Sequence, residues 1–206
     1  MANFWACFKI INENLFRFDT RVYLQDIEKP LKDDLCIGAV IGKNPGSAQP
    51  TDIEINELQP IQLERDNFLP TIKSIITKSY RFYGNINIPS DSKNRYIQVL
   101  NLFYLCDSVL DNAIEKINGY TNHQICLTEN FNFHFIYYAW GEPDARINNY
   151  KIRFLNNQCK NHIWYDQRNG IIKNTIPNSE VDFPRHTQGF EHRLIVPYIA
   201  KLLNNV

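Results

Sequence analysis

The sequence lacks the short motifs that mark common cofactor and metal sites. It has no CxxC pair, no glycine-rich phosphate loop, no dinucleotide fingerprint and no serine elbow. Its five cysteines are widely scattered and odd in number, which argues against a disulfide framework, a zinc site and an iron–sulfur cluster. We therefore expect reduced thiols in a cytoplasmic protein that uses no cofactor and no metal.

The sequence also lacks a charge excess and a long apolar run. Its 22 basic residues balance 22 acidic ones, so a nucleic-acid binder of this composition needs a local basic face. No apolar run is long enough to span a membrane, and no carboxylate pair stands out as a two-carboxylate glycosidase site. The 206 residues contain no repeat and no linker, so we expect residues 1–206 to form a single domain and a monomer.

Apolar runs and helical patterns alternate along the chain. Continuous apolar runs predict buried strands at Leu35–Gly42, Tyr96–Leu105 and Phe133–Gly141. Helical patterns follow at residues 65–84, 107–119, 142–158 and 191–205. The first helix has Asp66 or Asn67 as its cap and Pro70 in its first turn, and the second is capped by Asp107 or Ser108. The last helix is expected to kink near Pro197. This order predicts an α/β fold with a parallel sheet and right-handed crossovers.

Two further segments predict antiparallel structure. Leu15–Leu24 is rich in aromatic and β-branched residues, which favours an N-terminal strand or hairpin near a sheet edge. Asn169-Gly170 is a strong turn signal and predicts a hairpin near residues 163–176.

The loop after the first apolar run, Asn44-Pro45-Gly46-Ser47, is the first candidate ligand loop. Pro45 fixes its own φ and Gly46 permits a positive φ, so the tripeptide alone fits a tight turn. In parallel α/β sheets, however, ligands bind at the carboxyl ends of the strands, where this loop lies. Both readings stay open on the tripeptide alone.

Asn101 and His186 lie at two other expected strand ends. Asn101 interrupts the apolar run "QVLNLF", and a buried amide without partners costs about 1–3 kcal/mol. It therefore either bonds neighbouring loops or faces a polar ligand. His186 lies in the loop "DFPRHTQG", where a lone histidine is commonly just solvated.

Four pieces in order, "GKNPGS", "VLNLFYLCD", "FIYYAWG" and "PRHTQG", together resemble the uracil-DNA glycosylase superfamily. The first resembles the Gly-x-Asn-Pro-Gly loop of the mismatch-specific uracil/thymine branch. The second and third resemble the Leu-Leu-Asn and Leu-Leu-Trp-Gly strands, and the fourth partly resembles the closing His-Pro-Ser loop. The series also resembles an uncharacterised bacterial and phage family with Asn-Pro-x-x-Ala, Ala-Trp-Gly and Pro-Arg-His motifs. The resemblance runs from about Leu35 to the C-terminus.

The resemblance implies a three-layer α/β/α fold around a central, mainly parallel four-stranded sheet, with the 163–176 hairpin as an insertion. It implies a DNA glycosylase that flips a base out of the duplex. Asn44 would orient the attacking water and His186 would stabilise the leaving base or a phosphate. The implied base-binding residues are Asn101, Pro45, Gly46, Ser47 and Phe68. The implied DNA-binding residues are Arg185, Thr187, Gln188 and Phe190, with Phe190 a wedge into the duplex.

Three departures from the family pattern bear on the substrate and the activity. Gly46 stands where uracil-specific members carry a bulky tyrosine, so we expect a pocket that admits a 5-substituted pyrimidine, such as a hypermodified phage base. "HTQ" replaces His-Pro-Ser, and the stretch between Gly141 and His186 is longer than in the family. These two changes fit either altered specificity or a relative that has lost catalysis. No lysine is placed for a Schiff base, so strand cleavage is not implied.

Three hypotheses for function follow from the sequence. The chain is a monofunctional glycosylase acting on DNA, in a setting such as defence against phage with modified DNA. Alternatively, it is a module of the same fold that binds a nucleotide or modified base without cutting it. The third hypothesis is a hydrolase of free nucleosides, which the balanced charge favours.

Overall fold

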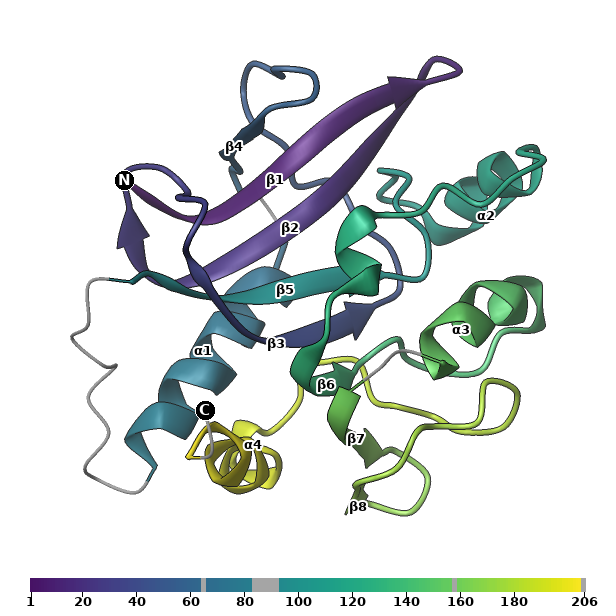
Figure 1. Cartoon of the computed structure of the whole chain (residues 1–206). Helices are drawn as coiled ribbons and strands as arrows, with labels where there is room; N and C mark the ends of the chain where they lie inside the picture. Colours follow the sequence, from purple (N-terminus) through teal and green to yellow (C-terminus); the bar gives the residue numbers. More distant parts are fainter. Residues whose placement is uncertain (64–65, 83–92, 157–158, 205–206) are drawn as a thin grey trace.

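A computed structural model describes residues 1–63, 66–82, 93–156 and 159–204 (Figure 1). The chain forms a mixed α/β structure with one eight-stranded sheet and α-helices on both of its faces. The strands are β1 (Ala2–Ile11), β2 (Asn14–Ile27), β3 (Leu35–Gly42), β4 (Leu58–Pro60), β5 (Arg95–Asn101), β6 (Phe133–Tyr138), β7 (Cys159–Asp166) and β8 (Ile171–Lys173). The α-helices are α1 (Phe68–Arg81), α2 (Leu110–Asn118), α3 (Asn148–Leu155) and α4 (Val196–Leu203).

The sheet is larger than the four strands that we expected. Its order is β4-β1-β2-β5-β3-β6-β7-β8. Strands β5, β3, β6 and β7 run parallel to one another, and antiparallel strands extend the sheet at both edges. The expected first strand, Leu35–Gly42, is confirmed, and its apolar run is long because both of its faces are covered.

The N-terminal hairpin is confirmed and belongs to the main sheet. β1 and β2 pair antiparallel, and β2 also pairs antiparallel with β5, where Thr20 lies opposite Val99. The two long strands therefore extend the sheet on the β5 side, as Figure 1 shows.

The second hairpin is present, but it is not an insertion beside the sheet. Its first arm, β7, is the parallel neighbour of β6, with Ile136 opposite His162. Its second arm, β8, pairs antiparallel with the end of β7 across the turn that contains Gly170, which has φ +67°. The signal at Asn169-Gly170 thus predicted the turn correctly, whereas the place of β7 depends on long-range pairing.

Two parallel strands end earlier than their apolar runs predict. β5 ends at Asn101 rather than Leu105, and β6 ends at Tyr138 rather than Gly141. The residues beyond each strand stay buried, and Leu105 still forms an isolated antiparallel bridge with Phe16 of β2. Asn101 is therefore the last residue of its strand.

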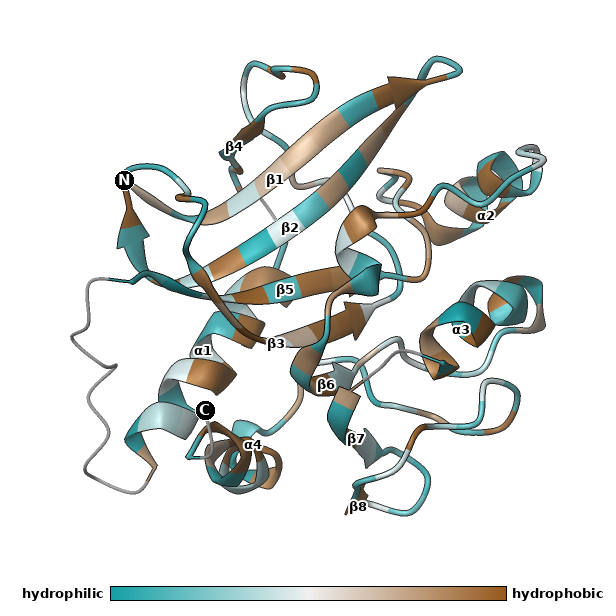
Figure 2. Ribbon diagram, viewed as in Figure 1, coloured by the Kyte–Doolittle hydropathy of each residue, from teal (hydrophilic) through white to brown (hydrophobic). Residues whose placement is uncertain are grey.

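Two hydrophobic cores lie on opposite faces of the sheet. Along β3, Val40 belongs to the core that includes Ile76 of α1 and Ile199 of α4. The next residue, Ile41, belongs to the core that includes Ile114 of α2 and Phe154 of α3. Figure 2 shows hydrophobic residues along the central strands between these helices.

The helix ends follow local rules with some corrections. At the start of α1, Asp66 rather than Asn67 supplies the cap, because Asp66 Oδ1 accepts hydrogen bonds from the amides of Phe68 and Leu69 at 2.7 and 3.3 Å. The expected end of this helix at residue 84 lies outside the described residues. Neither expected side-chain cap holds at α2, which begins after Val109. Pro197 lies in the first turn of α4 and does not kink it, since proline at that place loses no intrahelical hydrogen bond.

Two global features complete the description of the fold. Among the described residues, no helix is long and apolar enough to cross a membrane. All five cysteines are free thiols.

Candidate functional site

The candidate site lies at the carboxyl edge of the parallel strands, where two backbone hydrogen bonds each join a pair of chain segments. The amide of Leu102 donates to Gly42 O at 3.1 Å, which joins the loops after β3 and β5. The amide of Gly141 donates to Pro184 O at 2.8 Å, which joins the loop after β6 to the segment that contains His186. Residues from four distant parts of the sequence therefore share one edge.

Two adjoining hollows open at this edge. The larger has a volume of about 510 Å³ and the smaller about 260 Å³. The larger is lined by Lys43, Asn44, Trp140, Gly141, Glu142, Phe183, Arg185, His186 and Gln188. The smaller is lined by Asn44, Pro45, Gly46, Ser47, Asp66, Asn67, Phe68, Ser108, His186 and Gln188. Asn44, His186 and Gln188 line both hollows, so the two hollows adjoin, and together they are called the groove.

The Asn44 loop is held in a form that leaves polar groups available. Asn44 Nδ2 donates to Asp107 O at 3.0 Å, which fixes the amide plane. The buried Arg17 donates from Nη1 to Ala48 O at 3.0 Å and anchors the far end of the loop. Within the described part of the chain, the amides of Gly46, Ser47 and Ala48 donate to no other residue. Successive free amides of this kind can hold an anion or a polarised oxygen.

Asn101 is fully buried, and its side chain is unsatisfied. It is 1% exposed, and neither Oδ1 nor Nδ2 has a hydrogen-bond partner among the described residues. Its backbone oxygen, in contrast, accepts a hydrogen bond at 3.1 Å from Arg153, whose Nε lies 2.7 Å from Glu129. The strand end is therefore firmly held, while the Asn101 amide makes no hydrogen bond to a neighbouring loop among the described residues.

Phe68 lines the smaller hollow, and its ring lies near Asn101, which does not line it. A Cβ added to Gly42 would lie 2.8 Å from the Phe68 ring and 3.2 Å from Asn101 Oδ1. The ring and the amide oxygen thus share the space in front of Gly42, and only glycine leaves room for both. Phe68 also stacks on His186, with ring centroids 4.9 Å apart.

His186 is a neutral hydrogen-bond donor toward the groove. Burial, with the positive charges of Lys43 and Arg185, lowers the pKa of His186 below its ordinary value, and Asp66 opposes the shift. The Gln188 amide donates to His186 Nδ1 at 3.2 Å. Because Nδ1 accepts this hydrogen bond, the neutral ring carries its proton on Nε2.

Two expected DNA-binding residues are not on the surface. Thr187 is fully buried, and Phe190 is 6% exposed and packs on Tyr165 with ring centroids 4.9 Å apart. The Phe190 amide bonds back to Thr187 O at 3.1 Å, so the loop turns inward at this point. The expectation that Phe190 is a wedge into the duplex is wrong, because its ring is part of the hydrophobic core.

Arg185 and Gln188 remain at the rim of the groove. Gln188 is exposed, and Arg185 is half-buried with its guanidinium directed at the Gln167 side-chain oxygen. Both side chains line the larger hollow. The expected site residues therefore divide into a group that lines the groove, the buried Asn101, which lines neither hollow, and a buried pair, Thr187 and Phe190.

Lys43 is a site residue that sequence reasoning missed. It lines the larger hollow, a place to which the sequence reasoning assigned no lysine. Burial, followed by the charge of Arg146, lowers the pKa of Lys43, while Asp144 and Glu142 oppose the shift. The available signal was its position, since Lys43 directly follows a buried strand and precedes Asn44.

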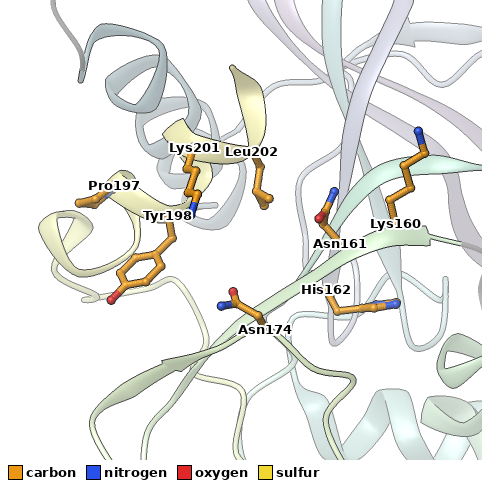
Figure 3. A pocket seen from close by; sticks show the side chains of 8 residues that line it. All are labelled: Lys160, Asn161, His162, Asn174, Pro197, Tyr198, Lys201 and Leu202. Atoms are coloured by element: carbon orange, nitrogen blue, oxygen red, sulfur yellow. The ribbon is translucent and has the colours of Figure 1, made fainter. Parts of the chain in front are cut away.

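A separate hollow of about 550 Å³ lies between β7 and α4 (Figure 3). It is lined by Lys160, Asn161, His162, Asn174, Pro197, Tyr198, Lys201 and Leu202. None of the expected site residues lies there. His162 Nδ1 is 2.9 Å from the Tyr138 hydroxyl, which gives this ring a structural partner.

The fold and the groove define an α/β protein with a candidate ligand groove at the carboxyl edge of its parallel strands. Comparison of the chain with models of known protein families, with curated proteins and with solved structures finds no match. Within the described ranges, no three His, Cys, Asp or Glu side chains are grouped to hold a metal ion.

Proposed function

We propose that the chain is a DNA glycosylase that excises a modified, 5-substituted pyrimidine by hydrolysing its N-glycosidic bond. The product is an abasic site, and the reaction needs no cofactor. The proposal includes the finer fold assignment, in which β5, β3, β6 and β7 form a core like that of uracil-DNA glycosylases. A cytoplasmic monomer active against phage with modified DNA is the setting that we propose.

The unsatisfied amide of Asn101 is the observation that carries this proposal. A buried polar group without a partner costs about 1–3 kcal/mol, and Asn101 is the buried amide side chain of the described residues that lacks a partner at both of its polar atoms. An amide offers one donor group and one acceptor, which matches the Watson–Crick edge of a pyrimidine. Asn101 lies at a strand end beside the groove, where a flipped base would arrive.

Entry of a base requires the Phe68 ring to move. The ring occupies the space in front of Asn101 and rests on His186. In our proposal the base displaces the ring, stacks on its face and bonds to Asn101. Stacking on an aromatic side chain suits any base, so the hydrogen bonds of Asn101 provide the selection.

Asn44 and His186 act on the glycosidic bond in this proposal. Asn44 Nδ2 is engaged by Asp107 O, so its oxygen is directed to accept a hydrogen bond from water. An amide cannot take the proton, and Asn44 therefore positions the nucleophile rather than acting as a general base. His186 donates from Nε2 to the departing base, whose negative charge a neutral donor can stabilise.

Gly46 supports a bulky substituent on the base. A Cβ added at Gly46 would meet no atom within 4 Å, and the residue has φ +68°. The smaller hollow is therefore open on the side where a tyrosine would restrict it in uracil-specific enzymes. Ser47, Arg185 and Gln188 lie around the groove and are the proposed contacts to the DNA backbone.

Base release from defined duplexes tests the proposal. The substrates carry uracil, a thymine mismatch, or 5-hydroxymethylated or glucosylated pyrimidines, and alkali cleaves the strand at each abasic site. We expect release of a 5-substituted base that falls about a hundredfold in Asn44→Ala, because the water is no longer positioned. Asn130→Ala is the matched control, since Asn130 is exposed and lines neither hollow.

The outcomes separate the three hypotheses. Binding of modified DNA without base release, unchanged in Asn44→Ala, would replace the enzyme by a recognition module. Release from free nucleosides, independent of salt, would identify a nucleoside hydrolase, since contacts to DNA phosphates weaken as salt rises. Equal release of uracil and of a bulky base would contradict only the preference for a modified base, and the glycosylase activity would stand.

A further inference from the structure

Lys43 occupies the floor of the larger hollow next to His186. Its Nζ is 3.7 Å from the position that a Cβ on Gly141 would occupy, and His186 Cβ is 4.0 Å from the same position. Gly141 has φ +86°, a conformation that favours glycine, so no side chain separates the amine from the hollow.

The ammonium group of Lys43 has no direct partner. Across the described ranges, no hydrogen bond and no ion pair within 4 Å involves its Nζ. Asp144, one of two nearby carboxylates, is already bound to Arg146 at 2.8 Å. Burial lowers the pKa of Lys43, so a larger fraction of the amine is unprotonated and nucleophilic near neutral pH.

In a bound nucleotide, Lys43 would lie next to the sugar rather than next to the base. If the base occupies the smaller hollow, its sugar lies where the two hollows meet, between Asn44 and His186. The larger hollow then faces the C1′ side of the sugar, where Lys43 lies. This step of the argument rests on the proposed glycosylase function.

We propose that Lys43 forms a Schiff base with the abasic sugar, so that the protein is a lyase as well as a hydrolase. The Lys43 amine adds to the C1′ aldehyde of the open-chain sugar, and the C1′ oxygen leaves as water to give an iminium ion. Loss of a C2′ proton to solvent then breaks the C3′–O bond, and the 3′ phosphate leaves with its oxygen. Water hydrolyses the remaining imine, which returns the free amine and leaves an unsaturated aldehyde. No oxidant or reductant is consumed.

Borohydride trapping on preformed abasic DNA tests this step without requiring base release. The full-length chain is mixed with a duplex in which a separate enzyme has already removed a single uracil, and sodium borohydride reduces any imine to a stable covalent adduct. We expect an adduct with the wild-type chain, located on Lys43 by peptide mass spectrometry, and strand cleavage when borohydride is omitted. Lys43→Arg loses both, because a guanidinium does not form the imine.

Lys160→Arg is the matched control, since Lys160 lines the separate hollow between β7 and α4 (Figure 3). It should form the adduct as the wild type does. Circular dichroism and thermal unfolding establish that Lys43→Arg is folded, and the peptide map of the wild-type adduct locates the lysine independently of that variant. No adduct, or an adduct on another lysine, overturns the proposal.

The results distinguish this inference from the proposed function. If the chain releases a modified base but forms no adduct, the proposed glycosylase activity stands and the proposed lyase activity is wrong. If the chain is trapped through Lys43 but releases no base, the proposed lyase chemistry stands and the proposed glycosylase activity is wrong.

Discussion

The ring of Phe68 stacks on the imidazole of His186, with centroids 4.9 Å apart and planes inclined by 24°. Phe68 begins α1, whereas His186 lies in the loop before α4, so the pair joins segments that are more than a hundred residues apart in the chain. The same Phe68 ring lies in front of the unsatisfied amide of Asn101. The pair therefore closes the groove at the place where the proposed base would bind.

Replacing Phe68 tests its role as a stacking face. We expect Phe68→Leu to raise the KM for base release by about tenfold, because base–aromatic stacking contributes about 1–3 kcal/mol. Steady-state kinetics on the preferred duplex measures this change. Phe131→Leu, a half-exposed aromatic that lines neither hollow, should leave KM unchanged. An unchanged KM in Phe68→Leu would remove Phe68 from the base-binding residues.

Replacing Asn101 should separate stability from activity. Asn101→Leu removes an amide that has no partner among the described residues, so we expect the free energy of unfolding to rise by about 1 kcal/mol while base release is lost. Urea unfolding followed by circular dichroism measures the stability.

The control for Asn101 lies three residues earlier on the same strand. Gln98 is also buried, and its Oε1 has no partner among the described residues, but its Nε2 donates to Thr20 O at 3.0 Å. Gln98→Met should lower the free energy of unfolding by about 1 kcal/mol, because it leaves that carbonyl unpaired. A loss of stability in Asn101→Leu as large as that in Gln98→Met would show that the Asn101 amide has structural partners.

Replacing Gly46 tests the size of the base. Gly46→Asn places a side chain in the open space of the smaller hollow, so we expect release of a bulky 5-substituted base to fall more than release of uracil. Asparagine is chosen because it tolerates the positive φ of Gly46 better than most residues. The ratio of kcat/KM values for the two bases measures the effect.

Gly189→Asn is the control for this substitution. Gly189 has φ +67°, close to the +68° of Gly46, and an added Cβ there also meets no atom within 4 Å. It does not line the smaller hollow, so the two variants carry similar backbone strain and differ in their effect on the substrate. Equal selectivity in both would show that Gly46 does not set the size of the base.

His186 makes stability depend on pH in a defined direction. Burial and the charges of Lys43 and Arg185 lower its pKa in the folded protein below the ordinary value of 6.5. The unfolded chain therefore binds more protons between these two pKa values, and the contribution of neutral His186 to stability is complete above 6.5 and is lost as the pH falls below it.

Nuclear magnetic resonance titration of the His186 ring measures this pKa directly. We expect an apparent pKa below 6.5, and a higher value in Lys43→Gln, since one of the nearby positive charges is gone. In His186→Gln, the decrease in the free energy of unfolding on acidification should be smaller than in the wild type. A His186 pKa at or above 6.5 would contradict the neutral donor assigned to the groove.

The sequence by itself determined the local elements of this protein. The apolar run Leu35–Gly42 marks β3 because a strand covered on both faces needs apolar residues throughout. The pair Asn169-Gly170 marks a turn because glycine adopts a positive φ without strain. The meeting of Asn44 and Gly141 also follows, because the parallel strands β3 and β6 bring their carboxyl ends to one edge.

Only the tertiary structure decided the features that depend on contacts between residues distant in the chain. β7 joins β6 in the main sheet, and Phe190 turns into the core, although neither choice is marked in the local sequence. The Asn101 amide lacks hydrogen-bond partners among the described residues because of the groups that surround it. The pKa of Lys43 is lowered because burial leaves little water around its amine. Desolvation and missing partners depend on residues distant in the chain, so the sequence pattern identified the edge that holds the site and only the folded structure determined its chemistry.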